Sequence, residues 1–448
     1  MLTLPSPIRT DAFAGKSLLL ATASALVMLA AAPAWGQASG NRGGTTQAAP
    51  VTTEEKPGED VSGERDAQRT AESYQPKGIE LGSFLLLPQL EVEETYNSNV
   101  FAAETDVRDD FITKVTPEFT LRSRFPVHAL NVRGRAEQYF FSKYSSDDRL
   151  DLNLNADARY DVTRTWEFRS FVDAFERAED RGAPDAARGR KPTDTRGATG
   201  RFGSSYRFDR LRISGDVGAH RKVFDDVATS GGAPVDNSDR NRWEYSADVR
   251  GSYELFPGYA GVVRGAVNRR EFTSAVDRNG LDRDSKGYRL ETGIGVDLSQ
   301  LVRGDFTVGY LNQDYEDPRL RDPSGLSFQA SFNWTPSRLT VVVPSVERSV
   351  QDTTQRTASS IVRTSASLLV RHELRRNIIL TGYGSVGEEK YKGAGQNSWT
   401  YEARTRVLYA LAPEYYVGAE LGHKARSSDI AAQDFKQSIV SIRLGVRL

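Results

Sequence analysis

The last eleven residues, 438–448, are SIVSIRLGVRL. Apolar and polar side chains alternate throughout this stretch, and a period of two places them on opposite faces of an extended strand. The apolar face consists of Val440, Ile442, Leu444, Val446 and Leu448, and the other face of Ser441, Arg443, Gly445 and Arg447. The pattern is typical of a soluble sandwich with one buried face. It is equally typical of a membrane barrel with lipid outside and a wet lumen inside.

The composition narrows the classes of protein. The chain has 448 residues, no cysteine and a formal net charge of −1. After the N-terminus no apolar run reaches the roughly 20 residues of a membrane-spanning helix, which excludes a helical membrane protein. The mean hydropathy of −0.52 is compatible with a membrane barrel, because alternation conceals the hydrophobicity of its strands. The lack of cysteine excludes disulfides and thiolate metal sites, and the balanced charge gives no indication of nucleic-acid binding.

Two segments precede the predicted barrel. Residues 1–36 are typical of a signal peptide, because Arg9 and Lys16 precede an apolar core and small residues follow it. A membrane anchor is the alternative. Residues 37–78 contain few large apolar side chains and are predicted to be a disordered periplasmic segment. A small plug or a partner-binding tail is the alternative there. The barrel is predicted for residues 79–448.

Alternating segments recur throughout residues 79–448. The clearest lie at 130–140, 150–160, 211–220, 243–254, 288–298, 326–334, 362–371 and 399–411. A one-residue slip in 130–140 would place Arg133 and Arg135 in lipid, at roughly 2–4 kcal/mol for each arginine near the midplane. The alternation therefore fixes which face of each strand points outward.

The connections between these segments alternate in length. Long polar loops are predicted at 97–110, 142–149, 177–194, 223–241, 273–286, 313–325, 349–357, 388–397 and 425–434. Tight turns are predicted at 125–126, 162–164, 208–210, 256–258, 300–304, 335–337, 374–377 and 412–414. The predicted fold is therefore all-β: a transmembrane up-and-down antiparallel β-barrel of about 18 strands, with both termini in the periplasm.

A barrel of this size encloses an aqueous channel. Charged and aromatic residues of the inward faces are the candidates to line it, as opposed charge ladders or as a sugar path. They are Arg133, Arg135, Glu137, Tyr139, Arg212, Asp216, Glu244, Asp248, Arg250, Arg289, Glu291, Asp297, Arg363, Arg371, Glu402, Arg404, Arg406, Arg443 and Arg447.

No arrangement of residues predicts catalysis, a cofactor or a metal site. Residues 382–387 match GxGxxG but lie inside a predicted strand with no helix after them. The four histidines are scattered. The acidic residues of 277–284 resemble a calcium loop in composition and lack its spacing. We therefore predict a protein that is not an enzyme, although an enzyme or adhesin carried on a barrel remains an alternative.

Several motifs resemble one family of outer-membrane proteins. Residues 94–101, ETYNSNVF, end the first predicted strand with Tyr-x-x-Asn-Val-Phe. FTLRS at 119–123, EQYFFSKY at 137–144 and YDVTR at 160–164 continue the pattern. In these features the chain resembles the putative β-barrel porin 2 family, over residues 81–448.

The resemblance implies a function that composition does not. Members of the family are often associated with export of exopolysaccharide or capsule, so a polysaccharide and periplasmic export components are expected partners. A general or substrate-selective diffusion porin is the alternative. Either reading places the protein in the outer membrane of a Gram-negative cell, in contact with lipid and lipopolysaccharide. The barrel-insertion machinery is expected to recognise the C-terminal strand.

Overall fold

The structure is a computed structural model that describes residues 74–448 except 187–188, 229–233, 299–300 and 431. Residues 1–73, which include the predicted signal peptide and nearly all of the predicted disordered segment, lie outside the described residues. The described chain is built almost entirely of antiparallel strands. None of its helical segments is long and apolar enough to cross a membrane.

The strands follow one another along the chain with two short 3-10 helices between them. The first part contains β1 (Ile79–Leu81), β2 (Phe84–Asn97), β3 (Asp110–Ser123), β4 (Ala129–Phe141), η3 (Ser145–Asp147), β5 (Arg149–Asp161), β6 (Trp166–Ala178), β7 (Asp194–Phe208), β8 (Leu211–Phe224), β9 (Val227–Ala228), β10 (Pro234–Val235) and η4 (Ser238–Arg240). The second contains β11 (Arg242–Phe256), β12 (Tyr259–Phe272), β13 (Ser285–Leu298), β14 (Val302–Tyr315), β15 (Ser324–Ser337), β16 (Thr340–Asp352), β17 (Ser360–Arg375), β18 (Ile378–Lys392), β19 (Gln396–Ala410), β20 (Tyr415–Ser428) and β21 (Phe435–Arg447).

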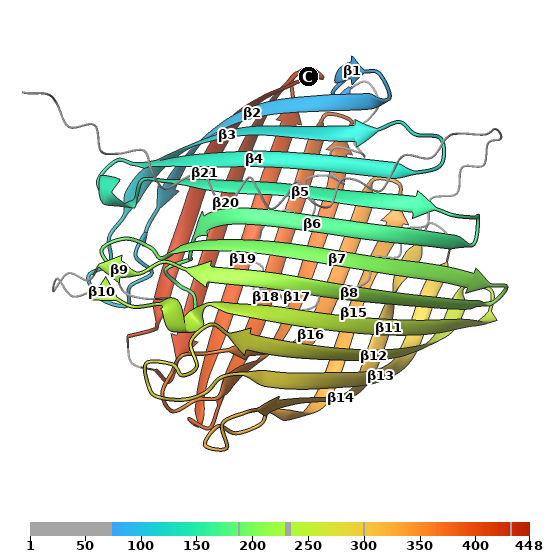
Figure 1. The fold of residues 1–448 in the computed structure, drawn as a ribbon. Coiled ribbons are helices and arrows are strands. Elements are labelled where there is room, and N and C mark those ends of the chain that lie inside the picture. The colour runs from blue at the N-terminus through green and yellow to red at the C-terminus, as the bar shows by residue number, and fades with distance from the viewer. Residues whose placement is uncertain (1–73, 187–188, 229–233, 299–300, 431) are drawn as a thin grey trace, which may run out of the picture. The chain divides into compact units, whose positions relative to one another are not determined.

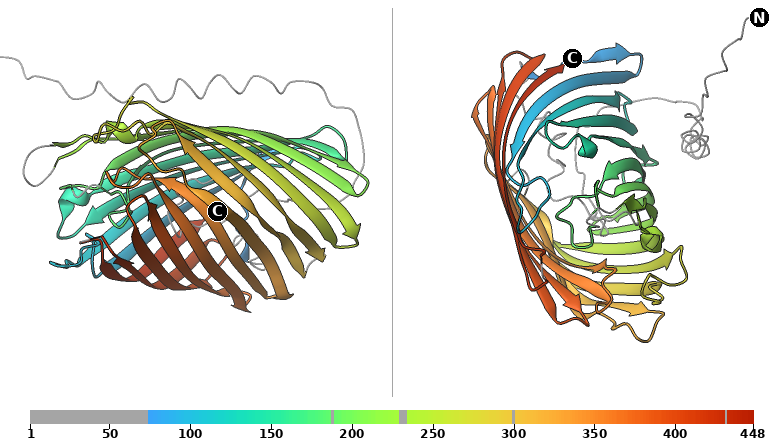
Figure 2. Two further views of the ribbon diagram at one scale, coloured as in Figure 1. Left: turned by 90° about the horizontal axis from the view of Figure 1, so that it is seen from below. Right: turned by 90° about the vertical axis from the view of Figure 1, so that its left-hand side faces the viewer.

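Eighteen of these strands close into a barrel, as the alternation predicted. Each pairs with the next along the chain, β8 pairs with β11, and β21 returns to pair with β2. The closing register runs from Gln89 opposite Arg447 to Asn97 opposite Ile439. The third strand partner of β2 is the short β1, and β9 and β10 form a separate hairpin. Closure pairs the backbone of the first and last strands and so removes the open edges that lipid would not tolerate (Figures 1 and 2).

The two rims of the barrel differ, as predicted from the connections. The loop rim, at the left in Figure 1, carries the longer connections, such as 225–241, which contains β9, β10 and η4. The turn rim at the right carries short ones, such as the two residues 209–210 between β7 and β8.

One predicted long loop is wrong. Residues 388–397 were expected to form a loop, but β18 continues to Lys392 and β19 begins at Gln396. Gly393 and Gly395 adopt φ of +95° and +68°, which allows the tight turn between them. The charges of 388–392 belong to a strand, where Glu389 is buried.

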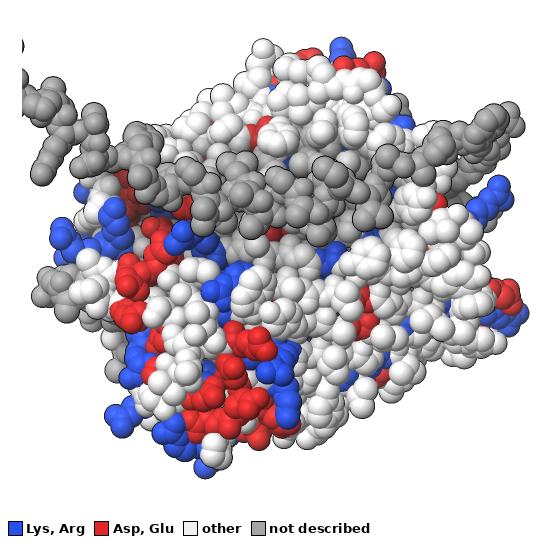
Figure 3. Space-filling view, in the orientation of Figure 1, with Lys and Arg blue, Asp and Glu red and all other residues white. Residues whose placement is uncertain are grey.

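The faces of the C-terminal strand lie as its alternation indicates. Ile442 and Leu444 are each 59% exposed on β21, whereas Ser441 and Arg443 are 2% and 9% exposed. In the wall of a membrane barrel, the outward face carries exposed aliphatic side chains, and the side chains of the inward face pack among charged groups. On the outer surface, Figure 3 shows acidic and basic residues gathered at the loop rim, whereas the visible wall beside it is largely uncharged.

Candidate functional site

A belt of alternating charges lines the inner wall where the barrel closes. Lys114 of β3 lies 3.7 Å from Glu137 of β4 and 3.5 Å from Glu93 of β2. Arg443 of β21 lies 2.9 Å from Glu93 and 3.0 Å from Glu420 of β20. Arg406 of β19 continues the belt, 2.8 Å from Glu420. Opposite charges thus connect six neighbouring strands across the closing seam.

Other predicted lumen residues form pairs of the same kind. The pairs are Arg133–Glu118, Arg135–Glu118, Asp248–Arg264, Arg250–Asp305, Arg289–Glu291, Asp297–Arg303, Arg363–Glu389, Arg371–Glu373 and Arg404–Glu402. Tyr139 lies under the Arg149 guanidinium, and Arg447 donates to the carbonyl oxygens of Pro413 and Tyr74. Arg212 and Asp216 lie on the same face of β8 as His220, because even-numbered positions of a strand share one face. Arg264 of β12 also donates to Gln329 of β15, with two strands between them, which a side chain can do only through the interior.

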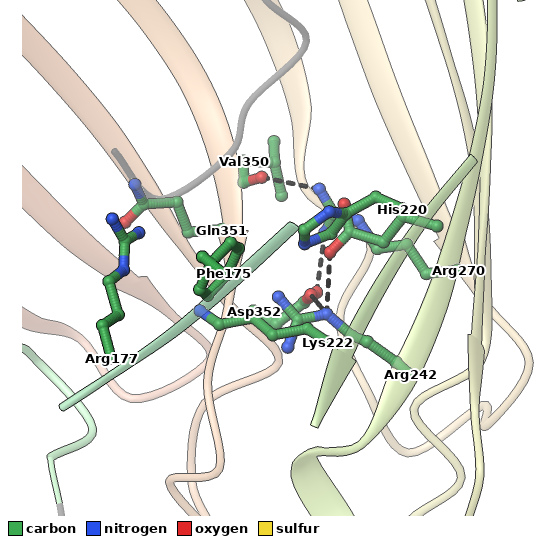
Figure 4. A pocket seen from close by; sticks show the side chains of 10 residues that line it. Phe175, Arg177, His220, Lys222, Arg242, Arg270, Val350, Gln351 and Asp352 are labelled. Carbon is green, nitrogen blue, oxygen red and sulfur yellow. Dashed lines mark hydrogen bonds and ion pairs between the residues drawn. The ribbon is translucent and has the colours of Figure 1, made fainter. Parts of the chain in front are cut away.

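Towards the loop rim, a pocket lies between two parts of the wall (Figure 4). One side is formed by residues of β6, β8, β11 and β12, and the other by the end of β16. Its lining residues are Phe175, Arg177, His220, Lys222, Arg242, Glu244, Arg270, Val350, Gln351 and Asp352. Of these, only Glu244 is among the residues predicted from the sequence.

Ion pairs join the two sides of the pocket. Asp352 of β16 accepts a 2.6 Å hydrogen bond from Arg270 of β12 and lies 3.1 Å from Arg242 of β11. Arg270 also donates to the carbonyl oxygen of Val350. Three strands separate β12 from β16 along the wall. These contacts therefore join two parts of the wall across the lumen.

The end of β16 reaches this position because it leaves its neighbour. The register of β15 with β16 stops at Gln329 opposite Glu347, whereas β16 and β17 stay paired up to Asp352 and Ser360. Val350 and Val362 consequently pack against Leu311 of β14. In the alternating segment 362–371, Val362 belongs to the apolar face that is expected to meet lipid, and this expectation is wrong: the side chain is only 3% exposed. Its alternation is intact, but the strand itself is displaced inward.

The described residues of the connection between β6 and β7, 179–186 and 189–193, lie across the mouth of the barrel. Its Arg181 is held by Asp147 of η3 at 2.8 Å, and Lys424 of β20 donates to Asp180 at 2.8 Å. Farther along, Asp185 accepts hydrogen bonds from the Thr353 hydroxyl and the Thr354 N–H at 2.9 and 3.1 Å. We call this connection the crossing loop. It contacts elements on several sides of the loop rim.

The close approach of an aromatic ring explains the glycine at position 182 of the crossing loop. Gly182 lies against Phe435 of β21, and a Cβ at this position would meet the ring at 2.8 Å. The Gly182 carbonyl oxygen accepts a hydrogen bond from Arg426. Arg426 in turn donates 2.8 Å to Glu389, and both side chains are at most 2% exposed. The crossing loop is thus anchored on a buried ion pair of the wall.

Alternation near the strand ends is the signal that could have found Lys222, Arg270, Glu389 and Arg426. Glu389 and Arg426 were assigned to the predicted loops 388–397 and 425–434, whereas Lys222 and Arg270 lay outside both the clearest alternating segments and the predicted loops. Inside a barrel, however, strands run beyond the membrane and their inward faces stay charged. Asp352 has no such signal, since only the displacement of β16 brings it to the pocket.

The acidic residues of 277–284 are engaged within the protein. Asp277 accepts hydrogen bonds from Arg283 at 2.7 Å and from the N–H groups of Asn279 and Leu281. Burial alone would raise the pKa of Asp277, but the hydrogen bonds from Arg283, Leu281 and Asn279 and the charge of Arg283 together outweigh it, and the pKa is lowered. Among the described residues, no three His, Cys, Asp or Glu side chains are grouped as metal ligands.

Crystal structures of several bacterial proteins share a limited likeness with this chain. The outer membrane protein OpdK of Pseudomonas aeruginosa is 11% identical, with 81% of this chain and 99% of that chain covered and a TM-score of 0.41. OccK3 (OpdO) of P. aeruginosa is 15% identical, with 81% and 95% covered and a TM-score of 0.41. OccAB3 of Acinetobacter baumannii is 12% identical, with 82% and 100% covered and a TM-score of 0.40. No curated protein matches the chain.

The match to a family model identifies the family. Residues 72–448 match the family described as putative beta-barrel porin 2, from just before β1 to the last residue. The resemblance carried by the motif at 94–101 and by those that follow it is therefore confirmed. With a closed barrel of eighteen strands and a match over nearly all of the described residues, this chain belongs to the putative beta-barrel porin 2 family.

Proposed function

We propose that the protein is a non-enzymatic channel through which small polar solutes diffuse across the outer membrane. The loop rim faces outward and the turn rim faces the periplasm, as in other barrels of this type. The charged inner wall gives solutes a hydrated path, and the exposed aliphatic side chains of strands such as β21 give the barrel a surface for lipid.

The crossing loop is the observation that carries this proposal. Its residues reach from β6 to the connection between β16 and β17, where Asp185 accepts the hydrogen bond from Thr353. Below it, Arg270 and Asp352 join two parts of the wall. A small solute passes such obstacles by diffusion, whereas a long polymer needs an uninterrupted path. The interior therefore supports the diffusion porin over the polysaccharide exporter that the family resemblance implied.

Conductance and permeability test the proposal. Protein purified from outer membranes is inserted in planar bilayers and in liposomes, and swelling is measured with sugars from a pentose to a tetrasaccharide. We expect stepwise conductance and a swelling rate that falls steeply with sugar size. Absence of conductance would contradict a channel. Loss of surface polysaccharide from a deletion strain, restored by the gene, would favour export instead.

A further inference from the structure

One aromatic residue on the inner wall of β6 is exposed to the lumen. Phe171 lies on the inward face of this strand, because it shares the parity of Asp173, which is opposite Asn155 on the inner face of β5. Phe171 is nevertheless 36% exposed. Other exposed large apolar side chains in the middle of the described barrel strands, such as Val172 and Phe202, lie on outward faces. In a barrel with a polar interior, an apolar ring left open to water is the exception and indicates contact with a solute.

The Phe171 ring has no stacked partner within the protein, unlike the next aromatic residue of the same face. Phe175 stacks with His220 at 6.5 Å between ring centroids, and the Arg177 guanidinium lies 4.5 Å from its ring centroid. Within the described part of the chain, no aromatic ring and no cationic group stacks on Phe171. The exposed part of this ring is therefore open to a flat apolar partner from the lumen.

Side-chain amides with spare hydrogen-bonding capacity lie beside the ring. Phe171 is opposite Asp157 of β5, so Asn155 is its diagonal neighbour on the same face, within reach of a group placed over the ring. Asn155 donates a 3.0 Å hydrogen bond to Asn153, and Asn131 of β4 donates a 2.9 Å hydrogen bond to Asp157. An amide has two N–H donors and a carbonyl oxygen with two lone pairs, so both asparagines keep groups that can bind a solute.

A pyranose sugar matches this combination of an apolar ring and neighbouring amides. Its face presents C–H groups that pack on an aromatic ring, and its edge presents hydroxyl groups that hydrogen-bond to amides. An aromatic surface with a few polar groups that fix orientation is typical of a site for a small solute.

We propose that Phe171 and Asn155 form a lumen subsite for a cyclic, polyhydroxylated solute such as a hexose. Phe171 packs on the face of the sugar, and Asn155 and Asn131 hydrogen-bond to its hydroxyl groups. This inference rests on the proposed function and makes it more specific. Among small polar solutes, the channel favours those that combine a flat apolar face with a hydroxylated edge.

Binding and passage are measured separately to test it. Saturation-transfer NMR of the detergent-solubilised protein measures binding of glucose and of sorbitol, an open-chain polyol without a flat face, and proteoliposomes report glucose uptake. We expect saturable binding of glucose and much weaker binding of sorbitol. In F171A, glucose binding weakens about three- to tenfold, as for a lost aromatic contact, whereas F171W retains it. N155A, which leaves the ring in place, weakens binding as well.

A matched variant separates the lumen ring from aromatic residues in general. Phe202 of β7 is 52% exposed on the outward face, where it stacks with Phe168, and we expect F202A to retain wild-type binding. Equal weakening in F171A and F202A, equal binding of sorbitol and glucose, or no saturable binding of glucose would overturn the sugar subsite. Binding of benzyl alcohol without binding of glucose would also overturn it and assign the ring to aromatic solutes.

The two measurements distinguish failure of the subsite from failure of the channel. Glucose binding that depends on Phe171, without uptake into proteoliposomes, would uphold the subsite and overturn the channel. Uptake of glucose without saturable binding would uphold the channel and overturn the subsite.

Discussion

Asp185 accepts a 2.9 Å hydrogen bond from the hydroxyl of Thr353, although the two residues belong to opposite parts of the barrel. Asp185 lies in the connection between β6 and β7, and Thr353 in the connection between β16 and β17. Around the wall, six strands lie between β7 and β16, and eight lie between β17 and β6. The hydrogen bond therefore links the crossing loop to the connection between β16 and β17.

Removal of this link should loosen the entrance. D185A deletes the acceptor of both the Thr353 hydroxyl and the Thr354 N–H, at a cost of about 1.5–3 kcal/mol for each hydrogen bond to a charged group. We expect larger and noisier single-channel conductance and faster liposome swelling with a trisaccharide. D106N, in an exposed ion pair of another loop, serves as the control. Unchanged conductance in D185A would show that the loop does not limit passage.

The orientation of β5 can be tested with two adjacent residues. Leu154 is 49% exposed on the outer face, and Asn155 lies opposite Asp173 on the inner face. L154R places a charge in lipid at roughly 2–4 kcal/mol and should lower the urea-unfolding free energy in vesicles. N155R would lie between Asp173 on β6 and Arg133 on β4, so opposite and like charges offset one another, and it should cost far less than a charge in lipid. If both variants lost the same stability, the assignment of faces on this strand would be wrong.

The buried pair Glu389–Arg426 should matter more than its neighbour on the same strand. Removal of one partner from a buried ion pair costs about 3–5 kcal/mol, because the remaining charge stays buried. E389Q should therefore lower the unfolding free energy strongly, and E389Q/R426M should recover part of the loss. Glu388 pairs with Lys390, which is half exposed, so E388Q should change stability by at most about 1 kcal/mol. Similar losses in E389Q and E388Q would refute the burial argument.

The loop at 273–284 should open in acid. The folded-state pKa of Asp277 is lowered, so its ionised form adds stability above the unfolded-state pKa of about 3.9. That stability is lost as the pH falls through the folded-state value. Hydrogen exchange at the Asn279 and Leu281 amides, which donate to Asp277, should accelerate below this pH. In D277N exchange should be fast throughout, and persistence of the wild-type acid response in D277N would assign it to another group.

Much of the architecture follows from local rules that the sequence obeys. Alternation along 438–448 determines which side of β21 meets lipid, because a period of two leaves one face apolar whatever the strand pairs with. The connections alternate between long and short, and this alternation likewise indicates the two different rims and the number of strands. The motifs at 94–101, 119–123, 137–144 and 160–164 together indicated the family.

Only the tertiary structure decided what obstructs the lumen. Val362 alternates as a lipid-facing residue, yet it is buried because β16 leaves β15 and carries β17 inward with it. Asp352 reaches Arg270 for the same reason, and Asp185 reaches Thr353 because a surface loop folds across the mouth. Periodicity describes a strand relative to its own axis. It contains no information on where that axis bends or on which distant side chains a loop meets, so the pocket and the crossing loop depend on contacts between residues far apart in the chain.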